Sequence, residues 1–580
     1  MLILAAFSAS ILLGQSLTED LGQYERLALE KVLRESELEI DPEPDGKQIG
    51  QVLVRNLPVF SEEQDGFLTT FNVLHRTTRD YIIQREVLLE PGDLWDEAKV
   101  FETKRNLRDP VFTSLVVAVP VKSALAGQVD LLVITRDIWS LRLNTDFEFQ
   151  DGRFTRLLLS ATENNLFGYR KRFAVTYSLD QGSFSIGPQY IDPNIYGTRL
   201  VFSHSSGLVF ARETSEQEGS FSTTSFSLPL FALDRKWGFQ TTVAHSSRNV
   251  RTFIGTELRT YDNPDTLEVE TIPRVFRQRS LDLDASVTRQ FPGAFNHRLQ
   301  LGYRLSRDRP EADLPDGTSE VDAQAFERDV LGRSETRTGP FVGYSVFERD
   351  FKIYRNVDTF DFPEDTRAGP TLTLEAALNP EAFGSDVNSV NVLAIAGWTV
   401  PFGPDSFARL SLTGSGRAQD NELLDRLFNS DFFLATPTLL RIARLVINAE
   451  YDRLDRETVN RFIVLGGDTG LRGFPIGAFT GDRRAVVNVE VRTIPIQVWF
   501  LRAGLLAFFD TGHAWDVNLG VLSDEFRETA PNFRFDYGLG LRAVAPQSNT
   551  LAWRLDWALA SEGPDSSLPG RITAGFGQTF

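Results

Sequence analysis

The sequence predicts a mostly β protein, a transmembrane antiparallel β-barrel of about 16 strands preceded by one small α+β domain. Three observations predict this fold class. Segments near both ends of residues 138–580 alternate apolar and polar side chains over about ten residues, the length of a tilted strand that crosses hydrocarbon. Residues 47–137 have a mixed pattern of helices and strands. Residues 463–484 hold a glycine-dense turn that suits a backbone folded into a confined polar space.

The composition excludes several classes of protein. No run of about 18 apolar residues follows the N-terminus, which argues against membrane-spanning helices. The net charge of -19, with no basic stripe, argues against nucleic acid as a partner because phosphate binding needs clustered Lys and Arg. The absence of Cys excludes disulfides and thiolate metal sites.

The first 46 residues predict two segments. Residues 1–15 have the apolar run of a secretory signal peptide, which is too short to span a membrane as a stable helix. No Lys or Arg precedes this run, so a buried N-terminal helix is the alternative. Residues 16–46 are acidic, and we expect a short helix followed by a solvated linker.

Residues 47–137 follow the order strand, helix, helix, strand, strand. Asp96 is in position to cap the second helix. On this pattern alone, any small α+β domain fits. The expected elements lie at residues 52–54, 77–87, 96–107, 115–119 and 129–134.

Clean alternation begins where this domain ends. Apolar side chains and Thr145 occupy one face of residues 139–149, and polar or charged side chains occupy the other face. One such strand fits a soluble sandwich equally well, but residues 533–542 and 551–559 repeat the pattern. Long polar loops are expected at 261–268 and 307–338. Repeated alternating strands separated by such loops favour the barrel.

The number of strands follows from the length of this region. About 440 residues supply roughly 16 strands if each hairpin takes about 55 residues. A barrel of that size has a lumen too wide for wall side chains to fill. The loop at about 463–484 is the candidate that occupies it.

Arg472 is the residue of this loop that we expect to make a specific contact with the barrel wall. A guanidinium folded into a polar lumen needs a carboxylate, and Asp510 lies on a strand whose residues Leu505, Ala507 and Phe509 take the opposite face. We therefore predict an ion pair between Arg472 and Asp510, with Glu490 as a second acceptor. The alternative is that Arg472 caps a surface loop. The loop motif consists of Gly466, Gly467, Leu471, Arg472, Gly473 and Phe474.

These segments resemble the superfamily of outer-membrane insertases and two-partner-secretion transporters that includes BamA and TamA. The common Val-Arg-Gly-Phe or Val-Arg-Gly-Tyr of that loop appears here with Leu471 in the first position. The wall motif that receives the loop arginine is similar to Asp510 and Gly512 with Phe508 before them. Residues 165–168 and 190–193 resemble the first hairpins, and the number of 16 strands rests partly on this resemblance.

The resemblance also covers both ends of the chain. Residues 47–137 resemble a POTRA domain, the periplasmic module that precedes such barrels. The C-terminal segment resembles the signal by which such barrels are themselves inserted, with Phe576, Gly577 and the terminal Phe580 at its end.

The resemblance implies a protein of a Gram-negative type of outer membrane, with its POTRA domain in the periplasm. It implies ATP-independent assistance to the insertion, assembly or translocation of polypeptides. Implied partners are unfolded outer-membrane or secreted polypeptides, the bilayer with its lipopolysaccharide, and periplasmic chaperones or accessory subunits that bind the POTRA domain.

The implied mechanism has two parts. The first strand (139–149) and the last strand (572–580) close the barrel weakly, and Gly575 and Gly577 thin the packing there. A client strand pairs with the opened edge, while the POTRA strands hold extended segments by β-augmentation. Two alternatives stay open: a passive or substrate-selective pore, and a lipid-homeostasis or structural scaffold.

The sequence contains no enzyme signature. No HExxH, Gly-x-Ser-x-Gly or Walker pattern occurs, so no catalytic residue, cofactor or metal is expected. His513 lies beside the wall motif, but a lone imidazole at a strand end is more often a structural hydrogen-bonding group.

Overall fold

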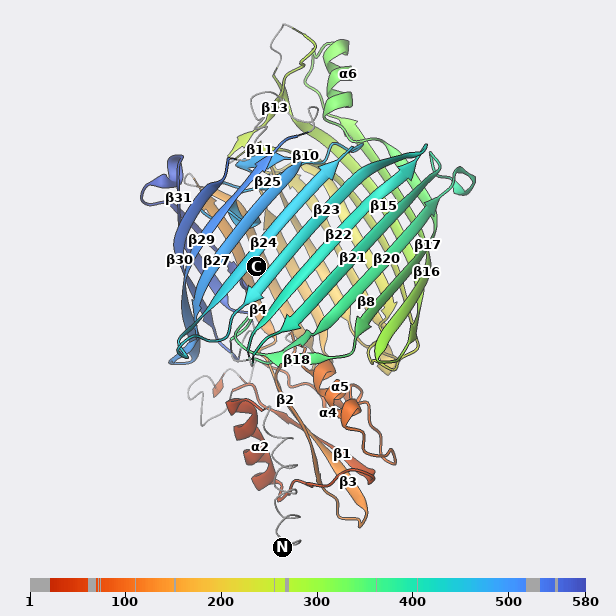
Figure 1. The fold of residues 1–580 in the computed structure, drawn as a ribbon, viewed down its shortest axis with the longest axis vertical. Helices are drawn as coiled ribbons and strands as arrows, with labels where there is room; N and C mark the ends of the chain where they lie inside the picture. Colours follow the sequence, from red (N-terminus) through yellow and green to blue (C-terminus); the bar gives the residue numbers. More distant parts are fainter. Residues whose placement is uncertain are drawn as a thin grey trace.

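A computed structural model describes residues 21–579 except 61–68, 71, 73–74, 110, 151–152, 255, 267–270, 361, 404, 518–531 and 548–550. The chain forms a large barrel with a small domain below its lower rim and a protrusion above its upper rim (Figure 1). The predicted signal peptide, residues 1–15, and the terminal Phe580 lie outside the described residues.

The small N-terminal domain is a three-stranded sheet in the order β1-β3-β2, with helices on both faces. β1 and β3 are parallel, and β2 and β3 are antiparallel. Asp96 caps α5 by accepting from the Lys99 amide at 3.2 Å. The elements are α2 (Gln23–Glu35), β1 (Gln48–Leu57), α4 (Asp80–Gln84), α5 (Glu97–Leu107), β2 (Thr113–Lys122) and β3 (Gln128–Asp137).

The acidic segment at 16–46 contributes a packed helix. Leu29 and Val32 of α2 pack on Val117 and Leu132 of the sheet, while α4 and α5 cover the opposite face with Ile83 and the rest of a second apolar cluster. Both faces of the sheet are therefore buried, and α2 belongs to the same folded unit as the sheet.

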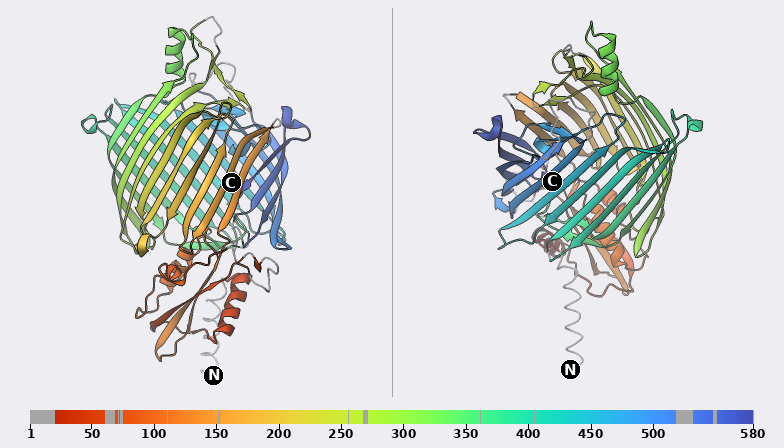
Figure 2. Two further views of the ribbon diagram at one scale, coloured as in Figure 1. Left: turned by 180° about the vertical axis from the view of Figure 1, so that it is seen from behind. Right: turned by 45° about the horizontal axis from the view of Figure 1, so that its top comes forward.

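The barrel wall is one closed antiparallel sheet in which β32 pairs with β4 (Figure 2). Its strands are β4 (Leu141–Gln150), β5 (Arg153–Leu166), β6 (Lys171–Leu179), β7 (Ser183–Asp192), β8 (Val201–Ala211), β9 (Gln217–Leu228), β10 (Trp237–Arg251), β15 (Val275–Phe291), β16 (Phe295–Ala312), β17 (Glu335–Glu348), β20 (Gly369–Asn379), β21 (Ser389–Pro401), β22 (Phe407–Gln419), β23 (Glu422–Ala435), β24 (Ala443–Asp455), β27 (Arg483–Thr493), β28 (Ile496–Val498), β29 (Leu501–Trp515), β30 (Arg534–Val544), β31 (Trp553–Ala560) and β32 (Arg571–Phe576).

The expected number of about 16 strands is wrong. β27 and the short β28 both pair with β29 and share one position, so the described wall has 20 strands. Several connections are shorter than the expectation allowed: two residues, Asp420 and Asn421, join β22 to β23. Part of the predicted loop at 307–338 is strand as well, because β16 extends to Ala312 and β17 begins at Glu335.

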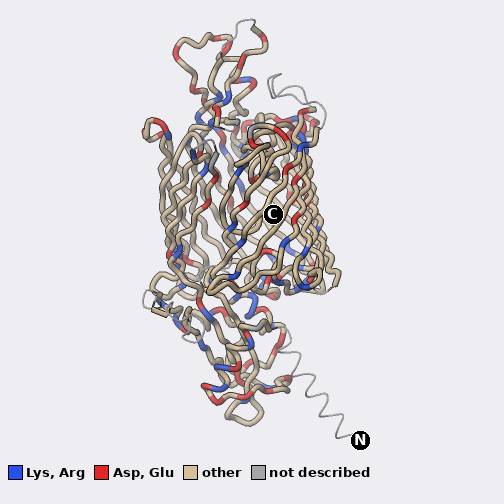
Figure 3. Tube along the Cα trace, turned by 90° about the vertical axis from the view of Figure 1, so that its left-hand side faces the viewer, with Lys and Arg blue, Asp and Glu red and all other residues tan. Residues whose placement is uncertain are grey.

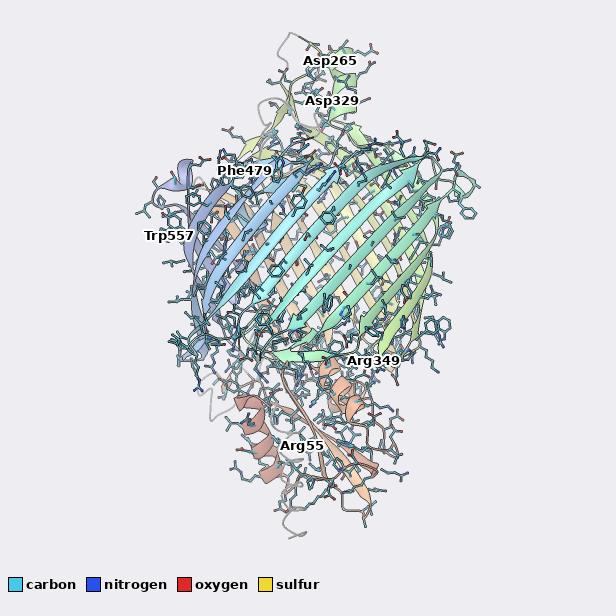
Figure 4. All side chains as sticks on the ribbon, viewed as in Figure 1. Arg55, Asp265, Asp329, Arg349, Phe479 and Trp557 are labelled. Atoms are coloured by element: carbon cyan, nitrogen blue, oxygen red, sulfur yellow. The ribbon has the colours of Figure 1, made fainter. Side chains whose placement is uncertain are left out.

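The wall has an apolar outer face and a polar inner face. On β31, Arg554 and Asp556 are buried on the inner side, and the tryptophans alternate with them; Trp557 lies on the outer side of the wall (Figure 4). Leu505 on β29 and Leu539 on β30 are 62% and 58% exposed to the outside. Exposed apolar side chains of this kind are stable against hydrocarbon. The described residues contain no helix with the length and apolarity needed to cross a bilayer.

The protrusion above the upper rim has a small core of its own. Tyr261 and Phe326 meet edge to face at 5.6 Å between ring centroids, and Arg328 pairs with Asp265 at 2.9 Å. Figure 3 shows charged residues on this protrusion, at both rims and throughout the N-terminal domain. The protrusion is built from β11 (Phe253–Ile254), β12 (Glu257–Leu258), β13 (Thr260–Tyr261), β14 (Ile272–Pro273) and α6 (Glu320–Asp329).

A second insertion crosses the lower opening of the barrel. This strap, residues 349–368, contains the hairpin of β18 (Phe351–Tyr354) and β19 (Glu364–Arg367), visible at the lower rim in Figure 1. Burial, followed by the nearby charge of Asp358, raises the pKa of Glu364, whose carboxylate accepts the Thr359 amide at 2.9 Å. The strap extends from the side of the wall formed by β17 and β20 and contacts the opposite side at Val544 and Ala552.

Candidate functional site: an arginine-bearing loop in the barrel lumen

The loop between β24 and β27, residues 456–482, folds into the barrel and packs on its inner wall. It contains a short hairpin of β25 (Ile463–Leu465) and β26 (Phe479–Gly481). Between these two strands lies the glycine-dense motif. The predicted inward loop at about 463–484 therefore corresponds to this hairpin, its turn and the start of β27.

Glycine is required at several points of this turn. Gly466 and Gly470 have φ of 126° and 125°, which L side chains rarely adopt. A Cβ on Gly470 would lie 2.8 Å from Val486 of β27, and a Cβ on Gly473 would lie 2.7 Å from Asp536 of β30. The lack of side chains lets the loop backbone lie directly against the wall.

Apolar side chains fix the turn on both sides of Arg472. Leu471 is 0% exposed and Phe474 is 5% exposed, and both belong to a cluster with Val486, Ala514 and others. Phe474 also meets Phe479 edge to face at 5.2 Å. Burial of this cluster holds the backbone that presents Arg472.

Arg472 is fully buried and bound by two wall carboxylates. Its Nε and Nη2 donate to both oxygens of Asp510, each at 2.8 Å, and its Nη1 donates to Oε1 of Glu490 at 2.5 Å. The guanidinium carbon lies 3.6 Å from the ring centroid of Phe508. The structure thus brings together the predicted arginine and both predicted carboxylates. Arg472 is therefore not the cap of a surface loop.

The carboxylates are held by further donors. Asn488 donates to Asp510 at 2.8 Å and to the Gly470 carbonyl at 2.7 Å, and Arg492 donates to Glu490 at 2.6 Å. Charge-assisted bonds in a fully buried site are strong, but desolvation offsets much of their net contribution. Removing one partner leaves a buried charge uncompensated, which costs about 3–5 kcal/mol.

Sequence reasoning missed several members of this cluster. Asp556 on β31 lies 3.8 Å from Arg472 and accepts Arg542 of β30 at 2.6 Å. The Thr579 hydroxyl accepts Arg472 at 3.3 Å and Arg554 at 3.2 Å. The inward parity of charged residues on β30 and β31 was a usable signal for Asp556 and Arg542.

Other predicted residues lie apart from the guanidinium. Gly512 packs against β27, where a Cβ would lie 2.7 Å from the Ala485 carbonyl. Phe576 is the last residue of β32 and pairs with Trp553, so the strand ends earlier than the expected 572–580. Gly577 has φ of 87° and turns the chain away from the strand direction.

The described residues include no cluster of His, Asp and Glu suited to a metal ion. His513 is fully buried and contacts the Phe479 ring edge to face at 5.2 Å. The alternating charges around Arg472 hold the loop to the wall.

A closed barrel with an apolar outer face, whose lumen holds a loop anchored by arginine to wall carboxylates, defines a membrane β-barrel with an inward loop. Residues 165–580 match the Omp85 superfamily domain, and the chain belongs to this superfamily. The barrel and the superfamily together place the chain in an outer membrane. The resemblance to BamA and TamA relatives is confirmed at the level of the superfamily.

The chain is similar to several solved structures at low sequence identity. BamA from Haemophilus ducreyi lacking POTRA domains 1–3 is 12% identical, with 92% of this chain and 84% of that chain covered and a TM-score of 0.36. CdiB from Acinetobacter baumannii and CdiB from Escherichia coli are each 12% identical over 92% of this chain, with TM-scores of 0.40. The alignments cover 73% and 77% of those two chains. No curated protein matches the sequence.

Proposed function

We propose that this protein assists the insertion, assembly or translocation of polypeptides at the outer membrane without ATP. Client strands would enter at the seam, the junction of β4 and β32. The N-terminal domain would act as a periplasmic POTRA domain that receives extended polypeptides and accessory proteins. The observation that carries the proposal is the shortness of the seam.

Three residue pairs join β32 to β4 in the described residues, whereas sixteen join β15 to β16. The seam pairs are Ile572 with Phe149, Thr573 with Glu148 and Ala574 with Phe147. Each ladder pair contributes backbone hydrogen bonds and cross-strand contacts, so the shortest junction opens at the lowest cost. An opened β4 or β32 would offer unpaired backbone groups to a client strand.

The N-terminal domain supports the proposal through its sheet edge. β1 is an edge strand of the three-stranded sheet and carries Val52, Val54 and Arg55. An extended client segment is able to add to such an edge by main-chain hydrogen bonds. The domain also lies under the lower opening (Figure 2), where a captured segment would be close to the seam.

A locked seam tests the proposal. Phe147→Cys with Ala574→Cys places two cysteines at paired Cα positions across the junction. The protein, reconstituted in liposomes with an unfolded outer-membrane barrel as client, is expected to lose folding assistance when oxidised and to regain it when reduced. Leu372→Cys with Ala396→Cys across β20 and β21 is the matched control and should change nothing. Full activity of the oxidised seam variant would refute the proposal.

A selective pore is the second candidate. A lumen cavity of about 480 Å³ lies on the wall away from the Arg472 cluster, lined by Gln240, Ser286 and Thr373 among others. Against a pore, Phe360 of the strap packs on Val544 and Ala552 beneath the opposite wall. Rapid swelling of liposomes in small sugars by the intact protein would favour the pore, and slow swelling would favour the plugged transporter.

A further inference from the structure

Four charged side chains form a clasp on the lumen side of the seam. Asp146 lies on β4, Arg156 on β5 and Arg554 on β31, and Asp468 belongs to the inward loop. The strands β4 and β32 lie between β5 and β31 in the wall. The clasp therefore reaches across the junction from both sides.

One carboxylate oxygen makes the bridge. Oδ2 of Asp468 accepts Nη2 of Arg156 at 2.5 Å and Nη2 of Arg554 at 2.9 Å. Arg156 Nη2 also donates to Oδ1 of Asp146 at 2.7 Å. The charges alternate along the clasp, so every neighbouring pair attracts.

Gly575 makes room for the clasp on β32. A Cβ at this position would lie 3.0 Å from Nε of Arg554 and 3.1 Å from Oδ2 of Asp146. Any side chain there would compete with the two charged groups for space. Besides thinning the seam, this glycine lets ionic contacts pass over the last strand.

We propose that Asp468 is a positioning residue that keeps the seam closed while the loop occupies the lumen. The seam opens by breaking the contact between Arg156 and Asp468, together with the buried ion pair of Glu148 on β4 with Arg571 on β32. The proposal rests on the opening seam of the proposed function. In this proposal, the inward loop holds that seam closed through Asp468.

The contacts decide which link breaks. The loop is fixed to the β27 and β29 side of the wall by the buried bonds of Arg472 with Asp510 and Glu490, so Asp468 stays with Arg554. Arg156 is 37% exposed and keeps Asp146 as a partner on its own side of the seam. Separation at Arg156 therefore leaves the smallest uncompensated charge.

Arg156→Gln tests the clasp in the full chain in lipid nanodiscs, with amide hydrogen exchange as the readout. Loss of the partly exposed contact with Asp468, the one of its two contacts that crosses the seam, should raise exchange of β4 and β32 about fivefold. Exchange of residues 466–474 should stay unchanged because Arg472 still anchors the loop. Unchanged exchange at the seam would overturn the proposal.

Asp146→Asn distinguishes a clasp that controls opening of the seam from a charge network that only stabilises the closed seam. Without Asp146, Arg156 depends more on Asp468, so opening should become harder and seam exchange should fall about twofold to threefold. A rise like that of Arg156→Gln would overturn the proposal, because a purely structural network weakens with either change.

Asp284→Asn is the matched control. Asp284 on β15 accepts Arg304 of the neighbouring β16 at 2.9 Å in the lumen, away from the seam. Its loss should leave β4 and β32 unchanged, and an equal effect would overturn the clasp. These measurements use no client, so they separate failure of the clasp from failure of the proposed function in the locked-seam assay.

Discussion

Two arginines of the lumen have the same kinds of partner but lie in different surroundings. Arg472 binds Asp510 and Glu490 and lies over Phe508. Arg304 on β16 binds Asp284 at 2.9 Å and Glu375 at 2.7 Å and lies 4.5 Å from the Phe341 ring centroid. The Arg472 side chain is 0% exposed, and the Arg304 side chain is 40% exposed.

The difference shows that burial, more than the list of contacts, decides what an ion pair does. Water screens Arg304 and its partners and can replace them, so the contact contributes little to stability. At Arg472 the guanidinium and both carboxylates are fully buried, so the contact with the guanidinium matters much more. The loop-packed wall of β27 to β31 is therefore expected to be firm, and the open wall of β15 to β20 is held mainly by its long ladders.

Of the variants that test this comparison, Arg472→Ala is expected to lower the free energy of unfolding most. Asp510 would remain buried without its cation and Glu490 would keep only Arg492, which costs about 3–5 kcal/mol. The free energy of unfolding in detergent, from urea titration, measures the loss. A change below about 1 kcal/mol would mean that the cluster is hydrated and does not anchor the loop.

Gly473→Ala is expected to have an intermediate effect. The new Cβ would meet Asp536 Cβ at 2.7 Å and the Ala560 amide at 2.9 Å, and overpacking of this kind costs about 1–3 kcal/mol. Gly343→Ala on the open wall is the control, because its Cβ would meet the flexible Gln300 side chain at 3.2 Å. Equal urea midpoints for the two variants would contradict a close fit between loop and wall.

Arg304→Ala is expected to have the smallest effect, within about 1 kcal/mol. The same unfolding experiment compares it directly with Arg472→Ala. High salt should reduce the difference in free energy of unfolding between Arg304→Ala and the intact protein, because salt screens exposed ion pairs. A loss as large as that of Arg472→Ala would show that burial does not separate the two sites.

Local patterns in the sequence were enough to predict the barrel and much of the anchor. Alternation placed Arg554 and Asp556 on one face of β31 because side chains along a strand alternate between its faces. The glycine turn identified Arg472, the parity of β29 identified Asp510, and the parity of β27 identified Glu490. These inferences depend only on short-range geometry.

Strand number and the wider network depend on longer-range geometry. Polar strands such as β8, with three serines and a histidine at Ser203–Ser206, resemble loops because they lack the clear alternation of apolar and polar residues. The contacts of Asp468 with Arg156 and Arg554 join positions far apart in the sequence. They follow from where the loop tip lies in three dimensions, which no local pattern encodes.

Single-channel recording in planar bilayers tests the anchored loop most directly. Intact protein and Arg304→Ala are expected to give small, flickering currents, and Arg472→Ala is expected to give larger currents because the loop is released from the wall. A large, steady current from the intact protein, unchanged by Arg472→Ala, would contradict the account.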